Sequence, residues 1–273
     1  MLPVTNSASR YANALDNANT RLFKAGEQMA SGKRINSAKD DAAGLAVASV
    51  LISQMGGFLQ SQSNISDGMS LLKTADAGLA ESSKAVGRMR ELAMQSANGT
   101  LSDSDRQALQ YEYAELSKQV DAIAKQANFN GKSLLDGSLN TSIQTGPNAG
   151  PENQKTLSIN AATPDALGIN ATDISSQAGA RAALDALDGA GKRIAATRAS
   201  IGGAASGLEA QLNMAQKSFE TTAAALSSIQ DTDYAAASAS SASAQVSQTA
   251  ALAALKSYQN IQSMTVSSLL PGK

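Results

Sequence analysis

The sequence predicts a mainly α-helical fold in which long antiparallel helices form a rod, with a terminal coiled-coil pair and a small β-hairpin element. Three observations lead to this prediction. Apolar residues recur at alternating spacings of three and four over stretches far longer than an ordinary helix. Alanine is the largest part of the 42% hydrophobic content, and aromatic residues make up only 3% of the 273 residues. Thin helices that approach closely are therefore expected in place of a thick globular core.

Four runs carry the helical spacing: Val4 to Met29, Val47 to Ala93, Leu109 to Ile123 and Leu184 to Ile229. The second and fourth have nearly equal lengths, so at 1.5 Å per residue each makes a rod of roughly 70 Å, and the two can pair along their whole length. The third follows the turn "ANGTLSDSD", in which Ser102 and Asp105 have the spacing of a capping box. It would fold back on the second run and complete an antiparallel three-helix rod.

The region 128–172 breaks the helical pattern with glycine and proline, and its segments 141–145 and 156–160 are predicted to pair as a hairpin. From Thr232 onward the chain is rich in alanine and serine and then carries a second apolar stripe. Both terminal stripes leave the same end of the rod. We therefore predict an inner terminal coiled-coil domain of residues 1–43 and 232–273, and an outer rod domain of residues 44–231.

Composition excludes several function classes. A formal net charge of −1 argues against nucleic acid as a partner. No apolar run is expected to approach the roughly 18 residues of a membrane span, so we expect no membrane insertion. Without histidine or cysteine, the common catalytic triads and zinc sites are absent. We expect no enzyme activity, no cofactor and no metal.

The stretch "SGKRINSAKDDAAGLA", residues 31–46, concentrates charge between two apolar runs. It would connect the terminal pair to the rod. We expect its polar residues to fix the relative orientation of the two parts through contacts with neighbouring copies; these are Arg34, Asn36, Lys39, Asp40 and Asp41.

The two terminal stripes suggest assembly with copies of the same chain. An isolated pair of helices with alanine-rich seams buries too little apolar area to offset backbone ordering, which costs on the order of 1 kcal/mol or more per residue. The ends should therefore be mobile in the monomer and fold on association, and contacts that do not close into a ring give a filament. The assembly residues are Val4, Tyr11, Leu15, Leu22, Met29, Leu252, Leu255, Tyr258 and Leu269.

Several segments resemble the bacterial flagellin family: "SGKRINSAKDDAAGLAVA", "NISDGMSLLKTADAGLAE", "VGRMRELAMQSANGTLSDSDR", "FNGKSLLDG", "IQTGPNAG" and "ALSSIQDTDYA". They occur in the family's order and cover the chain from end to end. The resemblance implies an inner coiled-coil domain built from both termini and an outer domain of long helices with a hairpin. The last long helix begins soon after the hairpin, which leaves no room for large central surface domains, as in a minimal flagellin.

The resemblance also implies partners and a location. These are export in an unfolded state through the flagellar type III export apparatus, an export chaperone on the C-terminal segment, a filament cap, a hook-filament junction protein, and an extracellular filament reached without a cleaved signal peptide. By position, Arg88, Leu92 and Glu112 match the segment through which the innate immune receptor TLR5 senses some flagellins, whereas Val86 and Gly87 depart from it. The residues Arg88, Arg90 and Glu91 could instead form local ion pairs on a solvated face or a lateral contact surface.

The leading function is thus a structural subunit of the flagellar filament. Two alternatives stay open from the sequence. One is a hook-filament junction protein of the same architecture. The other is a surface adhesin or glycan-binding protein on a flagellin scaffold, although aromatic platforms for sugars are scarce.

Overall fold

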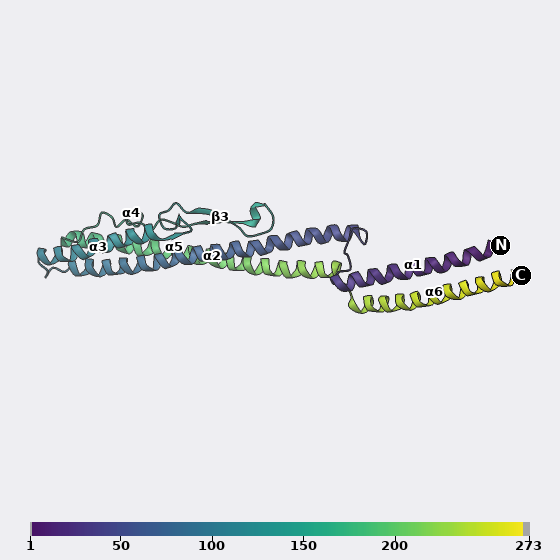
Figure 1. The fold of residues 1–273 in the computed structure, drawn as a ribbon. Helices are drawn as coiled ribbons and strands as arrows, with labels where there is room; N and C mark the ends of the chain where they lie inside the picture. The colour runs from purple at the N-terminus through teal and green to yellow at the C-terminus, as the bar shows by residue number, and fades with distance from the viewer. Residues whose placement is uncertain (1, 270–273) are drawn as a thin grey trace. The chain divides into compact units, whose positions relative to one another are not determined.

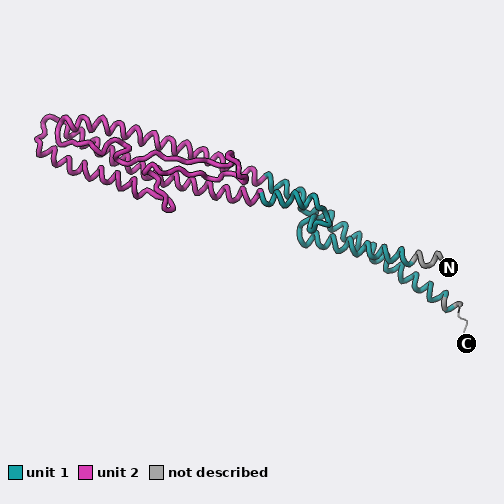
Figure 2. The backbone as a smooth tube through the Cα atoms, turned by 90° about the horizontal axis from the view of Figure 1, so that it is seen from above, with its two compact units in different colours: residues 1–53, 221–273 teal, residues 54–220 magenta. Residues whose placement is uncertain are grey.

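A computed structural model describes the backbone of residues 2–269 and the side chains of residues 8–265 and 267 (Figure 1). The chain divides into two compact units (Figure 2). Unit 1 contains Met1–Ser53 and Thr221–Lys273, and unit 2 contains Gln54–Glu220. Each unit is described here by itself.

The fold is mainly α-helical, as predicted from the sequence. Its helices are α1 (Leu2–Ser31), α2 (Ala42–Ser96), α3 (Asp103–Gln126), α4 (Pro164–Leu167), α5 (Gln177–Gln230) and α6 (Tyr234–Leu269), with a short 3-10 turn at Pro151–Asn153. The strands are β1 (Asn128–Phe129), β2 (Lys132–Ser133), β3 (Asn140–Gln144) and β4 (Gln154–Ser158). The four predicted helical runs all lie inside helices, and α2 and α5 have 55 and 54 residues.

The core of unit 2 lies between α2, α3 and α5. The apolar stripe predicted for α2 supplies the fully buried Ile65, Leu72 and Leu79, and α3 and α5 add Val120 and Leu187. Two charged positions interrupt the α2 stripe, and both are ion-paired across to α5. The guanidinium of Arg90 contacts the Asp188 carboxylate at 2.6 Å, and the carboxylate of Asp76 receives both Nε and Nη2 of Arg198. The pairs fix the antiparallel register of the two long helices.

The α2–α3 turn follows the predicted capping box. The Ser102 hydroxyl accepts the backbone N–H of Asp105, and the Asp105 carboxylate accepts the backbone N–H of Ser102 at 3.1 Å. This hydrogen bonding lowers the pKa of the Asp105 carboxyl. Nearby, the buried Arg106 donates to the carbonyls of Asn98 and Leu101, which closes the turn over the end of α2.

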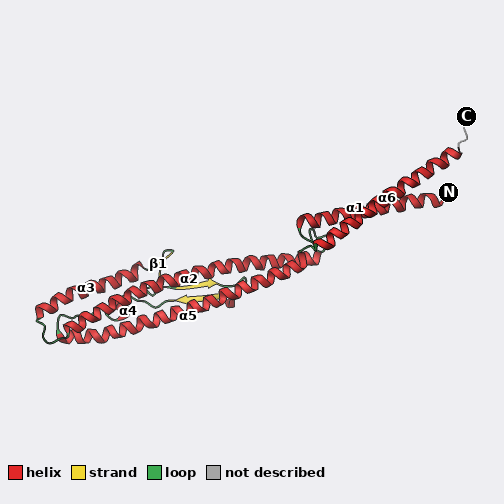
Figure 3. Ribbon diagram, turned by 90° about the horizontal axis from the view of Figure 1, so that it is seen from below, coloured by secondary structure: helices red, strands yellow, loops and turns green. Residues whose placement is uncertain are grey.

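The β3–β4 hairpin lies along the long helices (Figure 3). Its strands pair antiparallel from Asn140 opposite Ser158 to Gln144 opposite Gln154. The sequence placed these strands one and two residues too late. The β1–β2 pair and α4 were not predicted. The first has a recognisable signal, because Asn130 (φ 49°) and Gly131 (φ 76°) form the tight turn that an Asn-Gly dipeptide favours between two strands.

Three glycines of α2 allow the segment between α3 and α5 to pack closely against the helix. A Cβ built on Gly68 would overlap Cδ1 of Ile143, one on Gly57 would lie 2.6 Å from Cβ of Pro147, and one on Gly78 would lie 2.9 Å from Cδ1 of Leu135. Real Cβ atoms do not approach neighbours this closely. The three glycines therefore let the segment that contains β3 lie directly on the helix backbone.

In unit 1, α1 and α6 lie side by side and run antiparallel (Figure 1). Three contacts set their register: the Tyr234 hydroxyl donates to the carbonyl of Met29, the Gln248 amide donates to Asn19, and the rings of Tyr11 and Tyr258 lie 6.3 Å apart. Among the side chains that the structure describes, the buried positions of their seam are all alanine: Ala18, Ala25, Ala237, Ala244 and Ala251. The predicted pairing of the two terminal helices is confirmed, and its seam is thin.

One sequence expectation was wrong. Helix α2 contains an 18-residue window that is long and apolar enough to cross a membrane, and only 6% of that window is buried. Residues 42–66 contain no charged side chain, although scattered Ser and Gln residues interrupt the apolar ones. These small and polar residues do not lower the mean hydropathy of the window below that of a membrane span. The absence of membrane insertion stays a prediction.

Candidate assembly surfaces

Exposed apolar side chains are concentrated in unit 1. Ten of the fourteen exposed large hydrophobic residues in the described part of the chain belong to it. They are Tyr11, Phe23, Val47, Val50, Ile52, Tyr234, Val246, Leu252, Ile261 and Met264. Soluble monomers rarely expose contiguous apolar patches of more than a few hundred Å² without a binding role. Unit 1 is therefore the part of the molecule with the most surface left to bury.

The predicted terminal stripes divide between the α1–α6 seam and this exposed surface. Leu15, Leu22 and Met29 of α1 are half-buried on the side of the seam. On α6, Leu255 and Tyr258 are half-buried. Leu252 is exposed, as are Ile261 and Met264 of the same predicted stripe. The side chains of Val4 and Leu269 lie outside the described residues.

The connector between α1 and α2 is a network of intramolecular hydrogen bonds. Asp40 is its centre: its carboxylate pairs with Lys24 Nζ at 2.9 Å and accepts the backbone N–H groups of Asn36 and Ser37 and the Ser37 hydroxyl. The hydrogen bond with Lys24 is the largest cause that lowers the pKa of Asp40 from 3.8 to about 2. The carboxylate thus joins the last turns of α1 to the loop that follows.

Arg34 ties the same loop to the end of α5. Its backbone N–H donates to the carbonyl of Gln230 at 2.6 Å, and its guanidinium donates to the carbonyl of Ile229 at 2.6 Å. A cation at a helix C-terminus is favoured because the last carbonyls carry partial negative charge. Next to it, Ile35 is 1% exposed and anchors the loop. Lys33 and Asp231 form an antiparallel bridge beside these contacts.

The last acidic residue of the connector, Asp41, caps the N-terminus of α2. The Asp41 side chain accepts the backbone N–H of Gly44 at 2.8 Å, as an N-cap residue does. Arg34, Asn36, Asp40 and Asp41 all form hydrogen bonds within the chain, and their expected contacts with neighbouring copies stay a prediction. Lys39 differs, because it is exposed and its ammonium has no hydrogen bond or ion pair with the described residues. The charge of this stretch serves to cap helices and close a loop.

The predicted receptor or lateral surface is also largely engaged within its own unit. The Arg88 guanidinium pairs with Glu91 at 3.0 Å and with Glu112 of α3 at 2.9 Å, and both carboxylates raise its pKa. Arg90 is paired with Asp188, and this contact lowers the pKa of the Asp188 carboxyl. Leu92 is only 1% exposed. In this conformation it belongs to the core, and its place on a contact surface stays a prediction.

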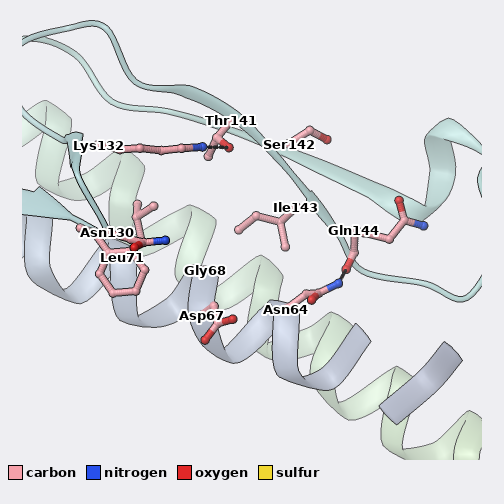
Figure 4. Close-up of a pocket in the computed structure, with 11 residues that line it drawn as sticks. Asn64, Asp67, Gly68, Leu71, Asn130, Lys132, Thr141, Ser142, Ile143 and Gln144 are labelled. Carbon is pink, nitrogen blue, oxygen red and sulfur yellow. Dashed lines mark hydrogen bonds between the residues drawn. The ribbon is translucent and has the colours of Figure 1, made fainter. Parts of the chain in front are cut away.

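A groove of about 580 Å³ lies between α2 and β3 (Figure 4). Ile143, Gly68 and Leu71 form its apolar floor, and Asp67 and Lys132 are among the polar residues of its rim. Lys132 reaches the Thr141 hydroxyl at 3.4 Å, and Asn64 donates to the carbonyl of Gln144. No group of three or more acidic residues that could hold a metal ion is found among the described residues.

Comparison with known proteins gives the family. The model of the bacterial flagellin N-terminal helical region matches residues 4–140, and that of the C-terminal helical region matches residues 184–270. A flagellar filament 30.7 kDa core protein of Treponema maltophilum is 34% identical over an alignment of 246 positions, which covers 85% of this chain and 86% of that protein. A flagellin of Halalkalibacterium halodurans is 36% identical over 213 residues, 78% of each chain.

Two solved structures agree with this. The crystal structure of Bacillus cereus flagellin has 35% sequence identity and a TM-score of 0.50, and the match covers 56% of this chain and 88% of that one. A putative flagellar hook-associated protein from Vibrio parahaemolyticus shares the fold at 17% identity, with a TM-score of 0.59 over 70% of this chain and all of that one. With both ends matched by the family models and most of its length aligned to relatives above 30% identity, the chain belongs to the bacterial flagellin family, a family of structural proteins.

Proposed function

We propose that copies of this chain polymerise into the flagellar filament, and that unit 1 orders fully only when neighbouring copies cover it. As a member of the flagellin family, the chain is a filament subunit. The single observation that supports unit 1 as the polymerising part is the concentration of exposed apolar side chains on it. The inner and outer domains would be residues 1–43 with 232–273 and residues 44–231. The two compact units divide the chain about ten residues inside these limits.

The thin seam between α1 and α6 supports this proposal. An alanine side chain that becomes buried contributes far less than a leucine or isoleucine, because the hydrophobic contribution scales with the apolar area removed from water, at about 25 cal/mol per Å². Fixing each backbone residue costs roughly 1–2 kcal/mol. Helices of 30 and 36 residues joined through alanines therefore gain much of their stability from additional partners. Copies of the chain in a polymer supply such partners.

The distribution of exposed apolar residues over unit 1 favours an open polymer over a closed ring. The exposed apolar positions of unit 1 occur on α1, α2 and α6, so different patches of neighbouring copies meet. Heterologous contacts of this kind give helical arrays when the rotation does not close into a ring. An extracellular filament that transmits motor rotation is the assembly the family resemblance implies. The contribution of the chain is then mechanical continuity, without catalysis.

Further partners follow from the same family membership. They are an export chaperone that covers the C-terminal segment, the type III export apparatus, a filament cap and a hook-filament junction protein, with export that removes no signal peptide. Chains with long unpaired apolar faces need such escorts before assembly, because exposed faces aggregate. The receptor TLR5 is the least supported partner, since Arg88 and Arg90 are ion-paired within unit 2 and Leu92 is buried.

Seeded polymerisation tests the proposal. Purified full-length protein is mixed with short filament fragments and viewed by electron microscopy, while hydrogen exchange reports the protection of α1 and α6 before and after growth. Long filaments together with protection that rises only on assembly are expected. Two results would contradict the proposal: persistent monomers in the presence of seeds, or terminal helices fully protected in dilute monomer. Monomers that bind a polysaccharide would favour the adhesin alternative, and capped ends without elongation would favour the junction protein.

A further inference from the structure

The rings of Tyr11 on α1 and Tyr258 on α6 lie against each other in unit 1. Their centroids are 6.3 Å apart and their planes are inclined by 53°. This separation is within the roughly 4.5–7 Å at which aromatic side chains contact each other edge to face or offset. Among the residues that the structure describes, no other two aromatic rings form such a contact. The pair therefore brings together two phenol groups from opposite ends of the chain.

Hydrogen bonds of the two helices hold these rings opposite each other. The Gln248 amide donates to the Asn19 side chain at 2.8 Å, about two turns of α1 and three turns of α6 away from the pair. The antiparallel register that this contact sets places Tyr11 beside Tyr258. The Tyr258 hydroxyl also accepts a hydrogen bond from the Gln262 amide at 3.2 Å, which restrains its ring.

The pair is partly open to solvent, and the composition of the chain directs oxidation to it. Tyr11 is 37% exposed, and Tyr258 is half-buried. Because the chain contains no cysteine, histidine or tryptophan, its most readily oxidised side chains are five tyrosines and eight methionines. Oxidation of methionine to the sulfoxide adds an oxygen atom and joins no two residues. Tyrosine is thus the residue type through which an oxidant can cross-link this chain.

The other three tyrosines have no phenol beside them among the described residues. Tyr113 is 1% exposed, and its hydroxyl is hydrogen-bonded to that of Thr172. Tyr234 is exposed, and its hydroxyl donates to the carbonyl of Met29. Tyr111 of α3 is 69% exposed, and no described ring contacts it. It therefore separates the effect of exposure from the effect of a neighbouring ring.

We propose that Tyr11 and Tyr258 are a site of oxidative cross-linking that joins the two ends of one chain. A one-electron oxidant removes one electron and one proton from each phenol, and the two radicals form a carbon–carbon bond between the ring positions ortho to their hydroxyls. Each of these carbons then loses its hydrogen as a proton, and each phenol oxygen regains one. The product, a dityrosine, contains two hydrogen atoms fewer than the separate side chains. With persulfate as the electron acceptor, the two electrons convert one persulfate ion to two sulfate ions.

The new bond would act on the terminal helices as a disulfide does. It closes a loop that contains most of the chain, so it removes conformations in which the two ends are far apart. Coupling is irreversible and captures the rings whenever α1 and α6 meet, including in a monomer whose ends separate part of the time. The inference depends on the contact within unit 1 and goes beyond the proposed polymerisation.

Photo-oxidation of dilute, unassembled full-length protein tests the site. The oxidant is a small ruthenium tris-bipyridyl complex that light and persulfate convert to its one-electron-oxidised form. Trypsin then cuts after Arg10 and Lys256, which releases one peptide that begins with Tyr11 and another in which Tyr258 is the second residue. Mass spectrometry should find these peptides joined, at the sum of their masses less two hydrogen atoms. An equal mixture of protein with and without a heavy nitrogen isotope should give joined peptides in which both halves carry the same label.

Phenylalanine variants are the matched controls, because they keep the ring and remove the phenol. Tyr11→Phe should abolish the joined peptide, whereas Tyr111→Phe should leave its yield unchanged. Hydrogen exchange supplies a second measurement on the natural chain. The amides of α1 and α6 should exchange at least about tenfold more slowly in the cross-linked protein than in untreated protein, because opening of the helix pair is restricted.

Four results would overturn the proposal. They are coupling of Tyr258 to Tyr111 as often as to Tyr11, joined peptides with randomly mixed labels, unchanged exchange in the cross-linked protein, and formation of methionine sulfoxide without any joined peptide. The last result is decisive because sulfoxide at an exposed residue such as Met264 shows that the oxidant was active. Failure of the natural chain to grow on seeds would instead reject the proposed function and leave the cross-linking site unaffected.

Discussion

Alanine substitution at two helical glycines should have opposite effects on the stability of unassembled protein. Gly203 of α5 has no atom within 4 Å of a built Cβ, so Gly203→Ala gains only the helix propensity of alanine, about 0.8–1 kcal/mol. Gly68 of α2 is buried, and its built Cβ would overlap Cδ1 of Ile143 and lie 3.2 Å from Cδ1 of Leu208. Overpacking of this kind costs typically 1–3 kcal/mol.

The propensity gain is the same at both sites, so it cancels in the comparison. Gly68→Ala should therefore be less stable than Gly203→Ala by about 1–3 kcal/mol, and less stable than the natural chain by roughly 1 kcal/mol. Urea unfolding followed by circular dichroism at 222 nm measures both differences. If Gly68→Ala were as stable as Gly203→Ala, the close seating of β3 on α2 would be refuted.

A double-mutant cycle isolates the contact. Ile143→Val removes the Cδ1 atom that the new methyl group would meet, and by itself it should cost about 0.5–1.5 kcal/mol. With this atom removed, Gly68→Ala should lose most of its penalty, so the two changes should couple favourably by about 1 kcal/mol or more. Strictly additive effects would show that the hairpin does not press on Gly68.

Three other predictions concern caps and charges. Ser102→Ala should destabilise the unassembled protein by about 1 kcal/mol through loss of the capping box, whereas Ser104→Ala on the exposed side of the same turn should change stability little; urea unfolding compares them. Lys24→Gln should raise the pKa of Asp40 from about 2 toward 3.8, as an NMR titration of the Asp40 carboxyl would show, and an unchanged value would exclude Lys24 as the main cause. Because its pair with Arg198 lowers the pKa of Asp76, this pair contributes stability that is fully present above pH 3.8 and is lost as the pH falls through the lowered pKa. Arg198→Gln should therefore be less stable than the natural chain at pH 7, and the gap should close below pH 3.8; a gap independent of pH would contradict the assignment.

The sequence was informative wherever a periodic pattern or a local signal specified the structure. The long helices follow from apolar spacing that only a helix places on one face, as at Ile65, Leu72 and Leu79. The α3 start follows from Ser102 and Asp105, whose hydrogen bonds depend only on neighbours in sequence. The hairpin was found one or two residues from its actual register, because strand ends depend on pairing partners that local residues do not name.

Contacts across the fold could not be predicted from local patterns. The sequence did not indicate that Arg34 bonds to the end of α5, far away in the sequence, or that Asp40 bonds to Lys24 of α1. Leu92 matched a surface motif, but its helical phase turns it into the core. The alanine-rich seam expected between the terminal helices is present in α6, where Ala237, Ala244 and Ala251 are buried, because two helices that pack closely select small side chains at the contact.

The sequence by itself determined that this chain makes long helices and carries an apolar stripe near each terminus, since periodicity and composition are properties of each segment alone. Only the tertiary structure decided which face of each helix is already used by the chain and which is left over. That difference depends on the mutual register of helices, fixed by contacts such as Arg90–Asp188 and Tyr234–Met29 between residues far apart in the chain.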